Sequence, residues 1–365
     1  MINRTYTINN RLLYFSFNQN NSCFCIGTEK GFTIYKSVPL NDYYSRELQG
    51  GIGIISMFNN SNILAFVGGG KRPFAPLNQL IIWNDSTSKV LCEISVDSKI
   101  IDVKIKDSLI AIILKKKIEI YYYDSLKNIV NYKNIDTIPT PENQSAIFGI
   151  NLEPSQNIIS YISKNIGEII IKIYDEYKED KEIISKTKKI SAHQSEITYI
   201  ALNYKGDLLA SSSEKGTIIR LFSTNTGKLL KEFRRGNDYA EIYSINFEKS
   251  SHYLICGSSK GTIHIFNLKS NKGPKNPKSF LSSFGSYLNI KNDYLKDEWS
   301  FAQMHIDVQG KYITNFIGED NTFVVLTDNG IYYRSKFSPS NGGECPIHQK
   351  KEYLFLEKNN DDFLF

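Results

Sequence analysis

Cysteine is scarce in this chain, and the few cysteines present are scattered. The sequence has 365 residues and five cysteines, at Cys23, Cys25, Cys92, Cys256 and Cys345. Their number is odd, none forms a CxxC pair, and the five histidines do not cluster with them. This usage does not fit a disulfide-stabilised secreted domain or a zinc module, so we expect reduced thiols in a cytosolic compartment and no metal site.

Long apolar runs are absent as well. The N-terminal sequence MINRTYTINNRLLYF lacks an apolar run of signal-peptide length, and no segment approaches the about 18 consecutive apolar residues of a membrane helix. We therefore expect a cytoplasmic protein that does not span a membrane. Peripheral binding to a membrane surface stays open.

A strong charge of one sign is also missing. The formal net charge is +6, which is compatible with an anionic partner but far below the basicity of a dedicated nucleic-acid binder. No nucleic-acid partner is expected. Hydrophobic residues make up 41% of the chain and charged residues 22%, so the sequence can bury a substantial core.

Recognisable catalytic motifs are lacking too. In VGGGKRP (67–73), Arg72 and Pro73 stand where a P-loop needs Ser or Thr and the start of a helix. His193-Gln194-Ser195 has no orienting acid at a recognisable spacing, which disfavours a nucleophilic triad. We expect no enzymatic activity and no cofactor.

What the sequence does contain is a recurring strand that follows a turn and ends in an aromatic residue. The seven examples are EKGFTIY (29–35), NQLIIW (78–83), KKKIEIY (115–121), GEIIIKIY (167–174), EKGTIIRLF (214–222), SKGTIHIF (259–266) and DNGIYY (328–333). Most closing aromatics are about 40 to 50 residues apart, the length of a four-stranded propeller blade. The pattern predicts an all-β protein: a seven-bladed β-propeller of the WD-repeat type, forming a single domain over residues 1–365.

Two adjacent arginines end one of the predicted strands, in KEFRRGNDYA (231–240). Neighbouring side chains of a strand point to opposite faces, so Arg234 and Arg235 should lie in different clefts between blades. Each has a matching set of small polar residues, since SEKGT (213–217) parallels SSKGT (258–262). Such groups suit phosphate oxygens, and the pattern suggests one anion site for each arginine. The alternative is that these are ordinary propeller turns with surface ion pairs.

At this point the sequence resembles a known family. The resemblance is carried by FRRGNDYAEIYSINF (233–247), GGIGIISMF (50–58), LAFVGGGKRPFAPLNQLIIWND (64–85), AHQSEITYIALNYKGDLLASSSEKGTIIRLFSTNTG (192–227), DEWSFAQ (297–303) and NGGECPI (341–347). These segments are similar to the PROPPINs, WIPI-type phosphoinositide-binding propellers of autophagy, in their short-loop branch. The resemblance implies two sites for phosphatidylinositol 3-phosphate or 3,5-bisphosphate. The first would contain His193, Ser211, Ser213, Thr217, Arg220 and Arg234, and the second Arg235, Ser258, Thr262 and His264.

A long insertion, residues 267–300, interrupts the sixth unit and is predicted to be a flexible loop. Its apolar residues share one helical face: Phe280, Leu281, Phe284, Tyr287 and Leu288. This face either packs on the propeller or enters a lipid interface. The resemblance favours membrane insertion.

The resemblance also implies an adaptor, monomeric in solution, that recruits other proteins to membranes bearing phosphatidylinositol 3-phosphate, such as phagophore, endosome or vacuole. Its implied partner is an autophagy lipid-transfer protein, contacted through the turn FNQNNSCF (17–24). Asn18 there matches the family, whereas Asn20 replaces an acidic residue. Two alternatives remain: a scaffolding propeller without lipid dependence, and an enzyme that uses the central channel.

Overall fold

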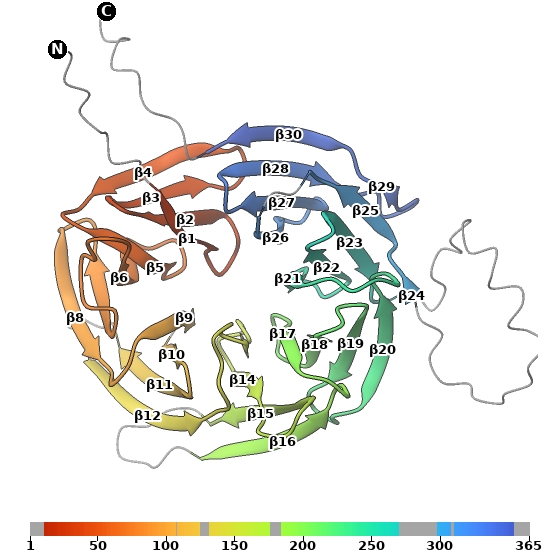
Figure 1. Ribbon diagram of the computed structural model, residues 1–365, viewed down its shortest axis with the longest axis horizontal. Coiled ribbons are helices and arrows are strands. Elements are labelled where there is room, and N and C mark those ends of the chain that lie inside the picture. The colour runs from red at the N-terminus through yellow and green to blue at the C-terminus, as the bar shows by residue number, and fades with distance from the viewer. Residues whose placement is uncertain are drawn as a thin grey trace, which may run out of the picture. The chain divides into compact units, whose positions relative to one another are not determined.

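The computed structural model describes residues 11–106, 108–124, 131–175, 184–269, 298–307 and 310–353. Over these ranges the regular elements are all β-strands, and they form seven sheets (Figure 1). In the same ranges, no helix has the length and hydrophobicity that crossing a bilayer requires. The predicted all-β, seven-bladed propeller class is therefore confirmed.

The first three sheets are four-stranded meanders. Their strands are β1 (Leu12–Phe17), β2 (Cys23–Thr28), β3 (Gly31–Lys36) and β4 (Asn41–Glu47); β5 (Gly51–Met57), β6 (Ile63–Gly69), β7 (Gln79–Asn84) and β8 (Lys89–Ser95); and β9 (Ile100–Lys106), β10 (Leu109–Leu114), β11 (Lys117–Asp124) and β12 (Asn131–Pro139). Within each sheet, neighbouring strands run antiparallel.

The other four sheets follow the same plan, and two of them gain a fifth strand. Their strands are β13 (Phe148–Ile150), β14 (Asn157–Ile162), β15 (Glu168–Tyr174) and β16 (Ser185–Ser191); β17 (Ile197–Leu202), β18 (Leu208–Ser213), β19 (Ile218–Ser223), β20 (Leu229–Arg234) and β24 (Glu298–Trp299); β21 (Ile242–Phe247), β22 (Tyr253–Ser258), β23 (Thr262–Asn267), β25 (Ala302–His305) and β29 (Gly343–Glu344); and β26 (Tyr312–Ile317), β27 (Thr322–Thr327), β28 (Ile331–Lys336) and β30 (Ile347–Glu352). Each added strand runs parallel to its neighbour: β24 pairs with β20, and β29 pairs with β25.

The aromatic residue that closes each sequence repeat lies on the third strand of a sheet. These residues are Tyr35 on β3, Trp83 on β7, Tyr121 on β11, Tyr174 on β15, Phe222 on β19, Phe266 on β23 and Tyr333 on β28. All seven are buried. The closing aromatic of each repeat is therefore a core residue, whose ring is buried on the third strand of its sheet.

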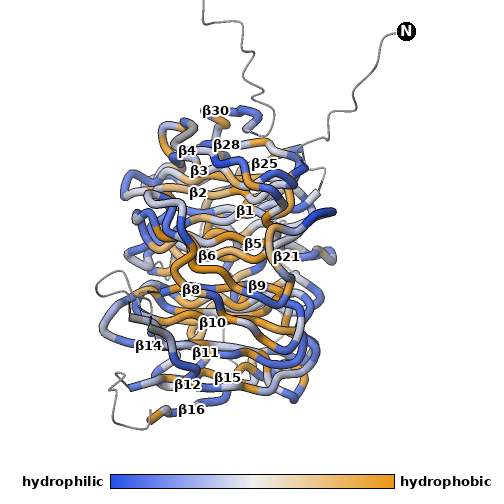
Figure 2. Tube along the Cα trace, turned by 90° about the vertical axis from the view of Figure 1, so that its left-hand side faces the viewer, coloured by the Kyte–Doolittle hydropathy of each residue, from blue (hydrophilic) through white to orange (hydrophobic). Residues whose placement is uncertain are grey.

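Burial falls from the inner strands to the outer ones. Every residue of β10, LIAIIL, is buried, whereas β16, SKTKKIS, buries only Ile190. Figure 2 shows the same gradient, with orange on β10 and blue on β16 and β30. Such a gradient is expected where inner strands pack on both faces and outer strands meet solvent.

Contacts divide the chain into two compact units. The described residues of the first are 11–139, 326–332 and 351–353, and those of the second are 140–325 and 333–350, apart from the gaps given above. The second unit contains the two arginines and every residue proposed to lie beside them. Within it, one hydrophobic cluster joins β13–β16 to β17–β20, and another joins β17–β20 to β21–β23.

Candidate functional site

The two arginines lie where β20 ends. Arg234 is its last residue and is opposite Ile218 of β19, while Phe233 is opposite Ile219. Phe233 is fully buried in the cluster shared with β21–β23. Strand alternation therefore places Arg234 on the sheet face toward β13–β16. It places Arg235 on the same face as Phe233, toward β21–β23.

The position of Arg235 agrees with this alternation. It is only 5% exposed, its Nε donates to Gly216 O at 2.8 Å, and its Nη2 donates to Asp238 O. Its charge acts on the sixth sheet: after burial, it is the next cause that lowers the pKa of His264, and it opposes the rise that burial produces in the pKa of Cys256. The guanidinium is thus held by backbone carbonyls beside β22 and β23.

A first polar cluster surrounds the middle of β19. Ser211, Arg220 and Glu232 are consecutive cross-strand partners, so they share one face of the sheet. Arg220 Nε lies 2.5 Å from Glu232 Oε1, and Arg220 Nη1 donates to Ala192 O at 2.7 Å. The next residue, His193, shares a 2.9 Å hydrogen bond between its Nε2 and Ser211 Oγ. The structure therefore brings His193, Ser211 and Arg220 together.

His193 is neutral in this environment. Its pKa is lowered from 6.5 to about 4, first by burial and then by the positive charge of Arg220. A neutral imidazole has one N–H donor and one acceptor nitrogen. It can therefore hydrogen-bond a phosphate oxygen without adding charge to the empty site.

The remaining first-site residues flank the β18–β19 turn. Ser213 and Thr217 are half-buried, and between them Gly216 takes a φ of 61°, which favours glycine. A Cβ on Gly216 would lie 1.8 Å from Ala240 O, so only glycine lets this turn meet the loop that follows β20. Thr217 O accepts hydrogen bonds from the backbone N–H of Arg235 at 2.9 Å.

A second polar cluster occupies the equivalent face of the sixth sheet. Cys256, His264 and Gln303 are consecutive cross-strand partners, and Thr262 is opposite His305. His264 is 7% exposed, and burial together with the charge of Arg235 lowers its pKa to about 3. This imidazole is neutral too. The row Cys256–His264–Gln303 repeats the geometry of Ser211–Arg220–Glu232 one sheet further on.

Ser258 carries an unsatisfied polar group in this cluster. Its backbone N–H donates to the Tyr312 hydroxyl at 2.8 Å, and that hydroxyl donates to Ser258 O at 2.8 Å. The Ser258 side chain is completely buried, and its Oγ finds no hydrogen-bond partner among the described residues. An unpaired buried hydroxyl is costly, and Ser258 shares this state with Ser160 and Thr314 in the same unit.

Sequence reasoning missed several residues that line the two clusters. Glu232 lies two residues before Arg234 on the same strand face, so strand alternation alone could have found it. Ser300 is the last residue of the long insertion, and Gln303 and His305 follow it; their place beside β23 depends on a pairing that no local pattern reveals.

The other predicted site residues lie elsewhere. Phe280, Leu281, Phe284, Tyr287 and Leu288 fall outside the described residues. The predicted bounds 267–300 are too wide for a loop, because Asn267 belongs to β23 and Glu298 and Trp299 form β24. Asn18 is 3% exposed and its side chain braces its own turn, donating to Asn60 Oδ1 at 2.7 Å and accepting from Cys23 N at 3.0 Å. Asn20 is exposed, and its Oδ1 accepts from Ser22 Oγ at 2.6 Å.

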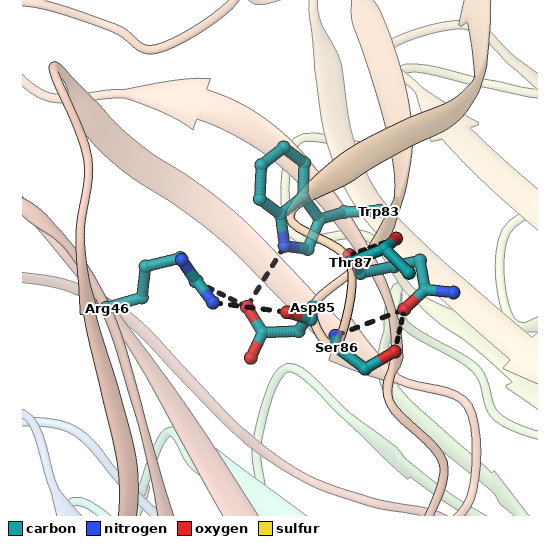
Figure 3. Close-up of polar contacts among 6 residues, drawn as sticks. Arg46, Trp83, Asp85, Ser86 and Thr87 are labelled. Atoms are coloured by element: carbon teal, nitrogen blue, oxygen red, sulfur yellow. Dashed lines mark hydrogen bonds and ion pairs between the residues drawn. The ribbon is translucent and has the colours of Figure 1, made fainter.

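A further charged cluster, in the first unit, is structural. Asp85 Oδ1 accepts from Arg46 Nε at 2.5 Å and from Trp83 Nε1 at 3.1 Å, and Arg46 Nη2 donates to Asp85 O at 3.1 Å (Figure 3). The guanidinium thus clamps β4 of one sheet to the β7–β8 turn of the next.

Among the described residues, no group of three or more His, Cys, Asp or Glu side chains could hold a metal ion. The groups that meet at the two clusters are guanidinium, hydroxyl and imidazole groups, which form hydrogen bonds and charge pairs.

Residues 11–354 match the PROPPIN family model. The chain belongs to the PROPPIN family. Autophagy-related protein 18e of Arabidopsis thaliana is 29% identical over 360 residues, covering 96% of this chain and 90% of the relative. SVP1-like protein 2 of Saccharomyces cerevisiae is 31% identical over 364 residues, covering 89% and 80%.

Solved structures share the fold. Kluyveromyces lactis Hsv2 gives a TM-score of 0.74 at 24% identity, covering 94% of this chain and 99% of that one. A complex of KlAtg21 with the coiled coil of AgAtg16 gives 0.68 at 23% identity, with the same coverage. Family membership confirms the resemblance seen in the sequence. It makes this PROPPIN an autophagy-related, phosphoinositide-binding propeller that associates peripherally with membranes, in a family of scaffolds and lipid binders rather than enzymes.

Proposed function

We propose that this PROPPIN binds two phosphoinositide headgroups, one on each side of β20, and so recruits autophagy or trafficking machinery to membranes. The lipids would be phosphatidylinositol 3-phosphate and 3,5-bisphosphate. The first site comprises His193, Ser211, Ser213, Thr217, Arg220 and Arg234, and the second comprises Arg235, Ser258, Thr262 and His264. One observation carries the proposal: β20 ends at Arg234, and alternation directs Arg234 and the next residue, Arg235, toward two different clusters of imidazole and hydroxyl groups.

The chemistry of both clusters suits a phosphomonoester. Guanidinium groups bind phosphate oxygens through charge-assisted, often bidentate, hydrogen bonds. His193 and His264 are neutral before binding, so each cluster keeps a small net charge while it is empty. A bound phosphate would then meet donors that are already in place.

Two headgroup sites and an inserted loop would act together at a membrane. Linked binding events reach an avidity far above that of any single one, provided that all can engage at once. Phe280, Phe284 and Tyr287 would supply the lipid-inserting face, although they lie outside the described residues. Lysines beside them would contribute about 1 kcal/mol each near an anionic surface.

The turn at 17–24 is proposed as a contact for a protein partner, such as an autophagy lipid-transfer protein. Asn20 is exposed there, whereas Asn18 shapes the turn from inside. A complex of the structural relative KlAtg21 with the coiled coil of AgAtg16 supports an adaptor role for this fold.

The deciding experiment counts headgroup sites. Calorimetric titration with soluble inositol 1,3-bisphosphate should give two sites for the wild type, one for Arg234→Thr, one for Arg235→Thr and none for the double variant. Arg72→Thr, which removes an exposed arginine of the first unit, is the matched control and should keep both sites. Unchanged binding by the double variant would overturn the proposal and favour a scaffold that does not use lipid.

A further inference from the structure

The chain returns from the insertion across both clusters. Glu298 and Trp299 of β24 pair in parallel with Phe233 and Arg234 of β20, and Lys231 Nζ lies 3.0 Å from Glu298 Oε1. Lys231 and Glu298 are both largely buried, with side chains 15% and 21% exposed. This short strand is therefore fixed to the strand that carries the first site's arginine.

The chain then crosses to the second cluster. Phe301 N donates to Ile265 O at 2.7 Å, which anchors the backbone to β23. Ser300, between the two anchors, places its Oγ 3.2 Å from His264 Nδ1. A hydroxyl from the residue that follows the fifth sheet's added strand thus meets the imidazole of the sixth sheet.

This contact has a consequence for the protons of His264. A neutral imidazole carries a single N–H, and the partner of one ring nitrogen decides which nitrogen holds it. If Ser300 donates to Nδ1, the proton stays on Nε2. A phosphate oxygen is an acceptor, so only an Nε2–H directed at it makes a favourable bond. His193 differs, because it meets its serine, Ser211, through Nε2.

We propose that Ser300 is a positioning residue of the second site, whose hydroxyl donates to His264 Nδ1 and so presents Nε2–H to a phosphate oxygen. The proposal rests on the proposed function for the identity of the ligand. Ser258 lies on β22, the strand paired with the one that carries His264, and its Oγ has no hydrogen-bond partner among the described residues. Phosphate in a lipid headgroup and free phosphate share this chemistry.

The test isolates the second site in an Arg234→Thr background. Ser300→Thr and Ser300→Val have nearly the same shape and differ in one hydroxyl, and Ser300→Ala is a third variant should the larger side chains disturb folding. Titration with inositol 1,3-bisphosphate should give similar affinities for the protein that keeps Ser300 and for Ser300→Thr. Ser300→Val and Ser300→Ala should bind about tenfold more weakly. Inorganic phosphate, run in parallel, should show the same order with weaker binding if the headgroup is the natural ligand. Equal or tighter binding of inorganic phosphate would assign the site to free phosphate.

The second readout does not depend on any ligand. Nitrogen-15 NMR of histidine-labelled full-length protein should show the Nε2–H tautomer of His264 when residue 300 is Ser or Thr. In Ser300→Val it should show a mixture of the Nε2–H and Nδ1–H tautomers. An Nδ1–H tautomer in the wild type, or equal affinities of Thr and Val, would overturn the role of Ser300. If the Arg234→Thr protein bound neither probe, the two-site function itself would fail, and the role of Ser300 at the second site would fail with it. The wild-type titration identifies that case.

Discussion

Glu232 lies directly across the β19–β20 ladder from Arg220, with 2.5 Å between Glu232 Oε1 and Arg220 Nε. The two side chains are only 14% and 28% exposed. A carboxylate opposes the binding of a phosphate, so its presence in the proposed first site needs another reason. Glu232 offsets the charge of Arg220 while the site is empty, and it holds the guanidinium in one orientation.

This pair predicts that stability and binding can be separated. Arg220→Met leaves Glu232 half-buried without its cation and should lower the free energy of unfolding by about 2 kcal/mol. Adding Glu232→Gln should restore most of that loss but not headgroup binding at the first site. Urea denaturation measures the stability, and titration in an Arg235→Thr background measures the binding. Recovery of binding by the double variant would show that Arg220 is not a ligand contact.

The histidines predict a pH dependence of stability. Their pKa values in the folded state are about 4 for His193 and about 3 for His264, against an ordinary value of 6.5. The unfolded chain therefore binds protons first, and stability that is fully present above pH 6.5 declines as pH falls towards 4. Each histidine contributes up to about 1.4 kcal/mol per pH unit in this window.

Replacing one of these histidines should remove its contribution to the pH dependence of the free energy of unfolding. The free energy of unfolding of His264→Gln should fall less steeply between about pH 6 and 4 than that of the wild type. His348→Gln, at an exposed position, is the control and should keep the wild-type slope. Parallel curves for His264→Gln and the wild type would mean that His264 is not held neutral.

The apolar face of the insertion is expected to contribute to membrane binding but not to binding of the soluble headgroup. Replacing Phe280, Phe284 and Tyr287 with Ser should weaken flotation with liposomes bearing phosphatidylinositol 3-phosphate and leave the titration with soluble headgroup unchanged. The reason is that the apolar face contributes only at a lipid interface. Replacing Ser282, Ser283 and Ser286 with Ala is the matched control. Equal loss in both assays would indicate that the loop packs on the propeller.

Local signals in the sequence predicted much of the fold. Period-two alternation and the closing aromatics located the third strand of every sheet, and alternation alone separated Arg234 from Arg235. These features depend on neighbours in the chain, so a single sequence is enough to show them.

Long-range pairings were beyond such reasoning. Ser300 reaches His264 only because the chain returns after residues 270–297 and pairs with β20. Tyr312 comes from the next sheet, and its hydroxyl contacts both the backbone N–H and the backbone carbonyl of Ser258. Sequence spacing carries no trace of either contact, since each depends on how separate sheets pack.

The clamp in the first unit predicts a variant that changes stability alone. Asp85→Ala removes the acceptor shared by Arg46 and Trp83, and should lower the free energy of unfolding by about 2 kcal/mol. Asp85→Asn keeps an oxygen for the indole and should cost about 1 kcal/mol. Ser86→Ala, in the same turn, is the control. Both Asp85 variants should retain two headgroup sites, because every proposed site residue lies in the second unit; a loss of sites in Asp85→Ala would show that the clamp supports binding as well as folding.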